Sequence, residues 1–519
     1  MTAPPPERRV PPAPAGLPAL LAHRAEADPE RVALICGPQQ LTFGAWRARS
    51  DALAAGLRAR GLAPGDRVAL RYGSSDWIEY AVAYCGVLRA GCVAVPVSDR
   101  QAPAVLTYLL ADSGAAAVLH RWDTPPPLRS GPEDLSGPAP WTATAQDVEA
   151  AGLEAAGDPA TGPEGLPLPA ATTLAQILYT SGTTGTPKGV TATHANLAYG
   201  CTLDERRRPL RHSAYFLHAF PVGTNAGQTM LVNALDAAAA GIAAPQFTPA
   251  RFARLIEEHG VGSVFVVPAM AIELLGSEAA RRHSTASVRL VGSTAAALPQ
   301  AVAVGLSKAF PQAQIVNYYT STEAAPAQIT LLFDPDRPDS PGRPASLREL
   351  RITDSDGRVL APGGTGEVWL RTPASPRTYH ADARAAAQVF RGRWVRMGDL
   401  GRLDEEGFLH LLDRERDVIK SGAYKVSTLQ VEDALHAHPS VADAAAVGVP
   451  HPVLGSVVAA VVVPRGELTA PALRTFLLDR LAAHELPSRL LFRPSLPRNE
   501  GGKILKRELR LLLDDEALR

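Results

Sequence analysis

A loop rich in glycine and hydroxyl side chains is the feature that most constrains what this chain can fold into. Residues 179–189 read YTSGTTGTPKG, with three glycines, five Ser or Thr residues and one lysine, Lys188. The apolar residues Ile177 and Leu178 come directly before it, so the loop is expected to follow a strand. Glycines let backbone N–H groups approach an anion closely, while the hydroxyls and the lysine add donors and positive charge. The segment therefore predicts a strand that ends in a binding site for nucleotide phosphates, with a flexible surface loop as the alternative.

Strands and helices alternate through most of the chain before residue 341. Helices are expected near residues 46–60 and 77–88, and apolar strands at 68–70 and 92–96. The same alternation returns between residues 249 and 319. A parallel sheet produces this order because each helix carries the chain back across the sheet to the next strand. The sequence thus predicts the α/β class.

The rest of the chain predicts further parts. After Pro341, short strands separated by glycine turns are typical of antiparallel or barrel-like structure. A smaller α/β unit begins near Arg414. A chain of 519 residues exceeds what one hydrophobic core supports, so at least two domains are expected. We place their boundary at Leu412–Asp413, which gives domains of residues 1–412 and 413–519.

Composition excludes several classes of partner. The 52 basic and 52 acidic residues balance, which gives no support for a nucleic-acid partner. No apolar run reaches the length of a membrane span, and the Pro-rich residues 1–16 lack the apolar core of a signal peptide and are expected to be disordered. The four cysteines have no C-x-x-C spacing, which favours reduced thiols in the cytoplasm. The 13 histidines form no metal-binding pattern.

The order of residues in the phosphate loop carries a resemblance. YTSGTTGTPKGV resembles the signature of the adenylate-forming superfamily, which comprises acyl-CoA synthetases, luciferases and the adenylation domains of peptide synthetases. Matching segments follow in the expected order from about residue 41 to residue 510. The resemblance implies a large N-terminal domain of α/β sheets with a barrel-like part, and a smaller, mobile C-terminal lid. It implies phosphate contacts from Thr180, Ser181, Gly182, Thr183, Thr184, Gly185 and Lys188.

Two later segments resemble the superfamily's other nucleotide contacts. YTSTE at residues 319–323 is similar to a Tyr-Gly-x-Thr-Glu motif, which implies that Tyr319 lies at the nucleotide, Thr322 at the α-phosphate and Glu323 at Mg²⁺. RMGDL is similar to a segment whose aspartate, here Asp399, accepts hydrogen bonds from the ribose hydroxyls.

The C-terminal part resembles a lid that serves two half-reactions. By this resemblance Asp413 is the hinge and Arg414 a nucleotide contact, while Lys420 and Gly422 belong to the face used for thioester formation. LPRNEGGK is similar to a segment whose lysine, here Lys503, stabilises the acid's carboxylate and the charge that develops on the α-phosphoryl group.

The acid pocket is expected around the segment FLHAFPVG. This segment occupies the place of the superfamily's aromatic/His segment, and the resemblance implies pocket residues His218, Ala219, Phe220 and Gly223, together with Met270. An amino-acid activator would usually have Asp near position 219 and a hydroxybenzoate activator often Asn, so alanine favours an apolar carboxylic acid. For His218, a packed core histidine is the alternative.

Three positions depart from the superfamily's pattern. Thr294 and Ala295 replace both glycines of a Ser-Gly-Gly segment, and Thr320 replaces the glycine of Tyr-Gly-x-Thr-Glu. We expect these side chains to reshape the pocket, with that of Thr320 pointing towards the acyl or adenylate group, and to weaken the placement of ATP or acid.

The resemblance implies an ATP-dependent acid–thiol ligase that uses Mg²⁺ and CoA. The acid would form acyl-AMP and then a CoA thioester. Alternatives are an adenylating enzyme that loads a carrier protein, a ligase that mainly thioesterifies acyl-AMP, and a nucleotide-binding regulator without turnover. The identity of the acid, and the choice between a monomer and a homodimer, are left open.

Overall fold

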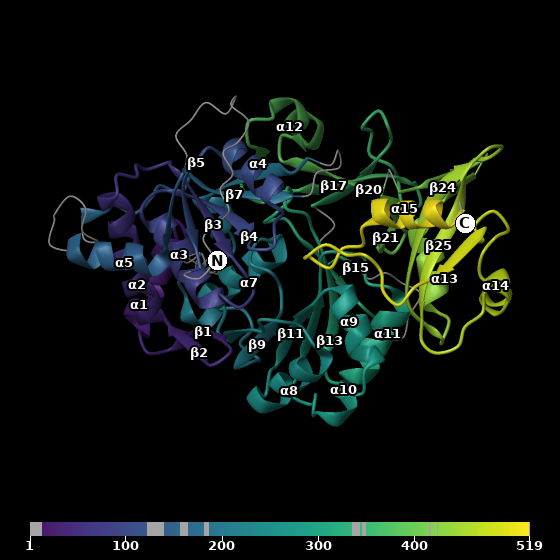
Figure 1. Ribbon diagram of the computed structural model, residues 1–519, viewed down its shortest axis with the longest axis horizontal. Coiled ribbons are helices and arrows are strands. Elements are labelled where there is room, and N and C mark those ends of the chain that lie inside the picture. Colours follow the sequence, from purple (N-terminus) through teal and green to yellow (C-terminus); the bar gives the residue numbers. More distant parts are fainter. Residues whose placement is uncertain are drawn as a thin grey trace, which may run out of the picture. The chain divides into compact units, whose positions relative to one another are not determined.

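The computed structural model describes residues 13–121, 140–155, 165–180, 186–334, 343–344, 349–414, 417–422 and 424–517. The chain divides into two compact units. The first is Met1–Gln246 with Arg377–Ala386, and the second is Phe247–Pro376 with Ala387–Arg519 (Figure 1). Both units combine helices with sheets, and each contains a group of parallel strands, which bears out the predicted α/β class.

A seven-stranded sheet in the first unit holds the strand that leads into the phosphate loop. Its parallel strands include β7 (Leu174–Thr180), followed by β8 (Lys188–Thr193), which runs back antiparallel to it. The pairing of the two strands extends to Thr180↔Lys188. The predicted strand before the loop is therefore present. The sheet order is β18 (Thr378–Tyr379), β8, β7, β4 (Val93–Ser98), β3 (Arg67–Tyr72), β5 (Ala115–His120) and β6 (Trp141–Thr144).

A second group of strands in this unit is formed by β2 (Gln39–Thr42), β1 (Val32–Cys36), β10 (Ala240–Ala243) and β9 (Tyr215–His218), in that order. Strands β1, β10 and β9 run parallel. The helices of the unit are α1 (Leu17–Ala27), α2 (Phe43–Ala59), α3 (Trp77–Arg89), α4 (Pro103–Ser113), α5 (Ala145–Glu154), α6 (His194–Leu197) and α7 (Asn225–Asp236).

Helices α2 and α5 touch backbone to backbone because glycine stands at the contact. A Cβ placed on Gly152 would lie 1.8 Å from the Ala52 carbonyl oxygen, and one on Gly56 would lie 1.9 Å from that of Val148. No larger residue fits at either position. Thr42 caps the N-terminus of α2, because its side chain accepts a hydrogen bond from the Ala45 N–H at 3.2 Å.

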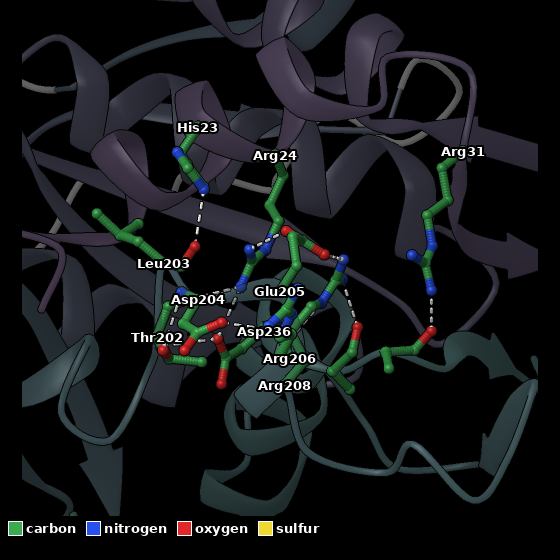
Figure 2. A network of polar contacts seen from close by, with 12 residues as sticks. His23, Arg24, Arg31, Thr202, Leu203, Asp204, Glu205, Arg206, Arg208 and Asp236 are labelled. Atoms are coloured by element: carbon green, nitrogen blue, oxygen red, sulfur yellow. Dashed lines mark hydrogen bonds and ion pairs between the residues drawn. The ribbon is translucent and has the colours of Figure 1, made fainter. Parts of the chain in front are cut away.

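A buried arginine joins α1 to the end of α7 and to the segment between β8 and β9 (Figure 2). Arg24 is 1% exposed, and its guanidinium lies 3.2 Å from Asp236 and 2.5 Å from Glu205. Its Nε also donates to the Leu235 carbonyl. Arg208 donates to Glu205 at 3.0 Å from the other side, so each buried cation meets a carboxylate and backbone oxygens.

The second unit contains the parallel strands β11 (Ser263–Val266), β12 (Leu290–Ser293) and β13 (Gln314–Tyr319), extended by antiparallel β14 (Ile329–Leu332) and β15 (Arg343–Pro344). Helices α8 (Pro249–His259), α9 (Pro268–Gly276), α10 (Ala279–Arg282) and α11 (Gln300–Ala309) alternate with the first of these strands. The predicted alternation between residues 249 and 319 is confirmed.

An antiparallel sheet follows, as predicted for the chain after Pro341. Its order is β16 (Leu350–Thr353), β17 (Gly366–Arg371), β20 (Trp394–Leu403) and β19 (Phe390–Arg391), with β21 (Leu409–Arg414) also paired to β20. Helix α12 (Ala383–Val389) precedes β19. Because Asp399 pairs with Arg414 and Leu400 with Asp413, strand β21 runs through the residue predicted to be the hinge.

The C-terminal part has its own sheet and core. The sheet order is β23 (Tyr424–Val426), β22 (Ile419–Ser421), β25 (Gly455–Pro464) and β24 (Val441–His451), with β26 (Arg489–Phe492) parallel to β25. Helices α13 (Thr428–His436) and α14 (Ala470–Leu478) contribute Val431 and Leu477 to one core cluster, and α15 (Lys506–Ala517) contributes Leu509 to another.

Within the described ranges, no helix combines the length and the apolar character needed to cross a membrane.

Candidate active site

The two ends of the phosphate loop are held in place by the hairpin of β7 and β8. Ser181, Gly182, Thr183, Thr184 and Gly185 lie outside the described residues, whereas Thr180 and Lys188 pair across the base of the hairpin. Tyr179 donates to Asp112 at 2.6 Å, which anchors the preceding strand to α4.

Lys188 has an acidic and an aromatic neighbour in its own unit. Its Nζ lies 3.8 Å from the Asp382 carboxylate and 5.1 Å from the centre of the Tyr379 ring. The sequence reasoning missed both partners because they lie almost 200 positions further along the chain. Tyr379 comes close because β18 pairs with β8, with Tyr379 opposite Val190.

His218 ends β9 and is fully buried. The Phe220 N–H donates to its Nδ1 at 3.2 Å, so the ring carries its proton on Nε2. Burial lowers the pKa of His218 to about 3, which keeps the ring neutral, and Trp77 meets it edge-on at 4.9 Å. Nε2 has no hydrogen-bond partner within the part of the chain that the structure describes. These contacts are typical of a packed core histidine, which was the alternative to a pocket residue. The group that could still serve the predicted acid pocket is the buried Nε2–H.

Three side chains that the sequence reasoning missed hold the turn after His218. Trp77 Nε1 donates to the Phe220 carbonyl at 3.3 Å, and Gln228 Nε2 donates to the Val222 carbonyl at 2.5 Å. Gln176 in turn donates to Gln228 Oε1 at 3.0 Å. A local signal existed only for Gln176, which interrupts the otherwise apolar strand LAQILYT, whereas Gln228 stands beside Asn225 and Thr229. These bonds fix the backbone of Phe220 and Val222 just before Gly223. Ala219, between His218 and Phe220, is half-buried.

Tyr319, Asp399 and Arg414 come together in the second unit. The Tyr319 hydroxyl donates to Asp399 Oδ2 at 2.6 Å, and Arg414 Nε lies 3.5 Å from Asp399 Oδ1. Burial and the neighbouring Asp399 carboxylate raise the pKa of Tyr319 well above its usual value, so the phenol stays protonated and donates. Three segments predicted separately to contact the nucleotide therefore meet at one carboxylate.

The loop after Tyr319 carries Thr322 and Glu323, both half-buried. Thr320 directs its hydroxyl at the Ala327 carbonyl, 2.6 Å away in the same loop. The hydroxyl of Thr320 thus bonds to the loop's own backbone, and its direction relative to an acyl or adenylate group stays a prediction.

Thr294 and Ala295 follow the end of β12. The Thr294 N–H donates to the Val266 carbonyl at 3.1 Å, which continues the pairing with β11. Ala295 has φ 73°, in the left-handed region that glycine adopts readily and alanine does not. The backbone thus keeps a glycine-like conformation although a methyl group is present. Met270, also predicted for the pocket, is 7% exposed on α9.

Asp413 is buried and binds the start of α13. Its carboxylate accepts hydrogen bonds from the Thr428 N–H at 2.5 Å and the Arg414 N–H at 2.7 Å. Burial raises the pKa of Asp413, while these bonds and the charge of Lys506 act in the opposite direction. The sequence reasoning missed Lys506, which donates to Thr428 Oγ1 at 2.6 Å and lies 3.1 Å from Glu432.

The two predicted lysines lie on different elements of the C-terminal part. Lys420 is exposed on β22, and Gly422 just after it has φ 58°. Lys503 lies on a tight hairpin, where its N–H donates to Asn499 Oδ1 at 2.9 Å. Arg498 fastens this hairpin because it donates to the Gly502 carbonyl at 2.7 Å and to Asp443 at 2.6 Å.

A cavity of about 330 Å³ in the second unit is not the predicted site. It is lined by Asn317, Leu412 and Asp433 among others, and none of the predicted catalytic or binding residues is part of its wall.

Two parts of the sequence match known protein families. Residues 21–380 match the AMP-binding enzyme family, and residues 430–503 match the AMP-binding enzyme C-terminal domain. A feruloyl-CoA synthase from Amycolatopsis sp is 32% identical over 509 residues, which cover 94% of this chain and 97% of that protein. The fatty acid–[acyl-carrier-protein] ligase ScoC from Streptomyces coeruleorubidus is 31% identical over 502 residues, which cover 94% of each chain.

Solved structures with the same fold cover almost the whole chain. The o-succinylbenzoate CoA synthetase MenE from Bacillus subtilis, in complex with ATP and magnesium ion, has a TM-score of 0.77 at 26% identity. The match covers 94% of this chain and 98% of that chain. The predicted fold, with a large N-terminal and a smaller C-terminal domain, is confirmed by this likeness.

Proposed function

Because the chain belongs to the family of AMP-binding enzymes, we propose that it is an ATP-dependent ligase that joins an apolar carboxylic acid to CoA. The acid's carboxylate attacks the α-phosphorus of ATP, and pyrophosphate leaves. The thiol of CoA then attacks the acyl carbon of the acyl-AMP, and AMP leaves. The observation that carries this proposal is the meeting of Tyr319, Asp399 and Arg414 beside the loop of Thr322 and Glu323.

Asp399 is the residue that would hold the ribose. A carboxylate can accept two hydrogen bonds side by side, which matches a pair of vicinal hydroxyls. Tyr319 and Arg414 fix its orientation from two directions, so little side-chain freedom is lost when the nucleotide binds. Thr322 would donate to the α-phosphate, and Lys188, released from Asp382, would pair with the outer phosphates.

The donor set after β13 fits Mg²⁺. Glu323 and Thr322 offer a carboxylate and a hydroxyl, which are the hard oxygen ligands that this ion prefers. In the described ranges, no group of three or more acidic, histidine or cysteine side chains is placed to hold a metal. Mg²⁺ bound by one or two protein oxygens and by substrate phosphates needs no such group. When bound, the ion would neutralise negative charge on the phosphates, and the carboxylate of Glu323 would be its protein ligand.

The pocket's chemistry supports an apolar acid. His218 is neutral, Ala219 has no polar group, and Phe220 is buried. An amine or phenol on the substrate would have no charged partner among these three residues. The acid's own carboxylate remains for Lys503, whose ammonium would offset the charge that develops at the α-phosphorus.

The part of the chain after Leu412 would act as a lid with two working faces. We assign Lys503 to acyl-AMP formation and Lys420 with Gly422 to thioester formation, and we place the hinge at Asp413. The large domain is then 1–412 and the lid 413–519. The four cysteines are buried and free, which supports a reducing compartment such as the cytoplasm.

ATP–pyrophosphate exchange across a panel of carboxylic acids tests the proposal. We expect exchange with at least one apolar acid and, when CoA is added, an acyl-CoA product detected by mass. Absence of exchange with every acid, in the presence of tight ATP binding, would favour the regulator.

A carrier protein is the second candidate acceptor because ScoC, at 31% identity, is an acyl-carrier-protein ligase. Acylation of a holo-carrier protein but not of CoA would select it.

A further inference from the structure

Strands β13 and β14 are joined by the loop that carries Thr322 and Glu323. The strands pair antiparallel, with Tyr319 opposite Ile329, and residues 320–328 connect them. Thr320 is the first residue after this last pair. Its hydroxyl donates to the Ala327 carbonyl at 2.6 Å, whereas the Ser321 carbonyl is 3.3 Å away. Because a hydroxyl has one hydrogen to donate, the shorter contact takes it.

Inside the loop, three further bonds fold the backbone into successive turns. The Ala325 N–H donates to the Ser321 carbonyl at 3.0 Å, the Ala327 N–H to the Ala324 carbonyl at 2.9 Å, and the Ala324 N–H to Ser321 Oγ at 3.1 Å. These bonds order the loop but do not tie its far end to the strand. The bond from Thr320 to Ala327 does so, directly beyond the last backbone pair.

The loop's apolar side is packed against the same core as the strands. Ala324 and Ala327 are buried and belong to one cluster with Tyr319 and Ile329. The Ala327 carbonyl therefore belongs to a buried residue, where an oxygen without a partner is unfavourable. Thr322 and Glu323 lie between Tyr319, which ends β13, and the buried Ala324.

We propose that Thr320 is a positioning residue, which closes the base of the loop and so holds Thr322 and Glu323 where MgATP is bound. The expected effect on MgATP binding rests on the proposed function, whereas the hydrogen bond from Thr320 to Ala327 is independent of it. Threonine suits the position because its branched Cβ restricts the side chain to few rotamers. Glycine would remove the donor and widen the backbone freedom of the loop. The side chain at residue 320 therefore supports nucleotide binding and does not obstruct it.

Hydrogen exchange of the loop amides tests the bond without any need for turnover. We would compare wild type with Thr320→Ser, Thr320→Val and Thr320→Gly, and follow a peptide that covers residues 320–328. Val keeps the branched shape without the hydroxyl, and Ser keeps the hydroxyl without the branch. We expect faster exchange in the Val and Gly variants, by about fivefold or more, as for one lost hydrogen bond. The Ser variant should stay near wild type. Thr330→Val on β14 makes the same chemical change outside the loop and should leave this peptide unchanged.

The consequence for the nucleotide is measured by titration calorimetry of ATP over a series of Mg²⁺ concentrations. Val and Gly variants should need about fivefold to tenfold more Mg²⁺ for the same affinity, whereas Ser should not. Unchanged exchange in the Val and Gly variants overturns the proposal, as does tighter MgATP binding by Thr320→Gly. If wild type binds no MgATP but exchange follows the expected pattern, the proposed function fails and the closure of the loop by Thr320 is upheld.

Discussion

Tyr319 donates its phenolic hydrogen to Asp399 across 2.6 Å, which joins the end of a parallel sheet to the antiparallel sheet that follows it. The two residues are 80 positions apart in the chain. Arg414 approaches the other carboxylate oxygen at 3.5 Å. A carboxylate oriented from both sides is preorganised for the two hydroxyls of a ribose.

Replacing Tyr319 with Phe should weaken both the fold and ATP binding. A hydrogen bond to a charged group contributes about 1.5–3 kcal/mol to stability, so the free energy of unfolding should fall by about this amount. Because Asp399 also loses one of the two contacts that orient it, the KM for ATP should rise, by roughly tenfold. The matched control is Tyr318→Phe, one residue earlier on the same strand, which should leave the KM for ATP unchanged. Equal effects from both substitutions would contradict the role given to the Tyr319 hydroxyl.

The two lysines of the C-terminal part should separate the half-reactions. Lys503→Ala should slow acyl-AMP formation by about 10²-fold or more, because one preorganised charge at the α-phosphoryl group is lost. Thioester formation from synthetic acyl-AMP should be largely intact. Lys420→Ala should show the reverse. Single-turnover assays of each step would measure both, and a parallel loss of the two steps in either variant would contradict a lid with two faces.

Ala295→Gly should stabilise the protein. A left-handed conformation disfavours alanine by about 1–2 kcal/mol, whereas the entropy of the unfolded chain favours alanine over glycine by about 0.4–1 kcal/mol. The difference predicts a gain of roughly 0.5–1 kcal/mol in the free energy of unfolding. The control is Ala296→Gly, a neighbouring exposed residue without a positive φ, which should be neutral or destabilising. Stabilisation of similar size at both positions would mean that strain at Ala295 is not the cause.

Two buried histidines should make the fold sensitive to mild acid. Burial lowers the pKa of His218 to about 3 and that of His194 to about 4. The unfolded chain binds protons at these groups near pH 6.5, whereas the folded chain does not. The stability that they contribute is complete above about pH 6.5 and is lost as the pH falls towards 4.

Urea unfolding measured at intervals between pH 7 and pH 4 checks this dependence. The slope of the unfolding free energy against pH should be smaller in His194→Asn and His218→Asn than in wild type. His259→Asn is the control at a histidine for which no such burial applies, and it should retain the wild-type slope. An unchanged slope in the first two variants would place the acid sensitivity elsewhere.

The buried ion pair between Arg24 and Asp236, drawn in Figure 2, should be costly to break from one side. Asp236→Asn removes a charge 3.2 Å from the fully buried Arg24 guanidinium, and loss of one partner of a buried pair typically destabilises by about 3–5 kcal/mol. The control is Glu26→Gln, which breaks an exposed pair with Arg47 and should change stability by less than about 1 kcal/mol. Thermal unfolding of both variants would rank them. A loss below 1 kcal/mol in Asp236→Asn would mean that Glu205 compensates alone.

Local sequence was enough to identify the elements and the class of chemistry. The alternation of apolar strands and helices depends on near neighbours, so the strand before the loop and the α/β class were predictable. Lys188, Thr322, Asp399 and Lys503 stand in short motifs, and their predicted roles come from the resemblance of those motifs to the superfamily's.

Only the tertiary structure decided what each of these residues touches. Tyr319 meets Asp399 because two sheets bring distant strand ends together, and Lys188 meets Asp382 because β18 pairs with β8. Gln228 and Lys506 carry no local signal, since their partners lie on other elements. At position 320 the sequence has threonine where the superfamily has glycine, and we expected the added side chain to reshape the pocket. The fold places an acceptor 2.6 Å from its hydroxyl, because the strands flanking its loop pair in register. A side chain's identity is local, whereas the direction and partner of its hydrogen bond are set by the backbone around it.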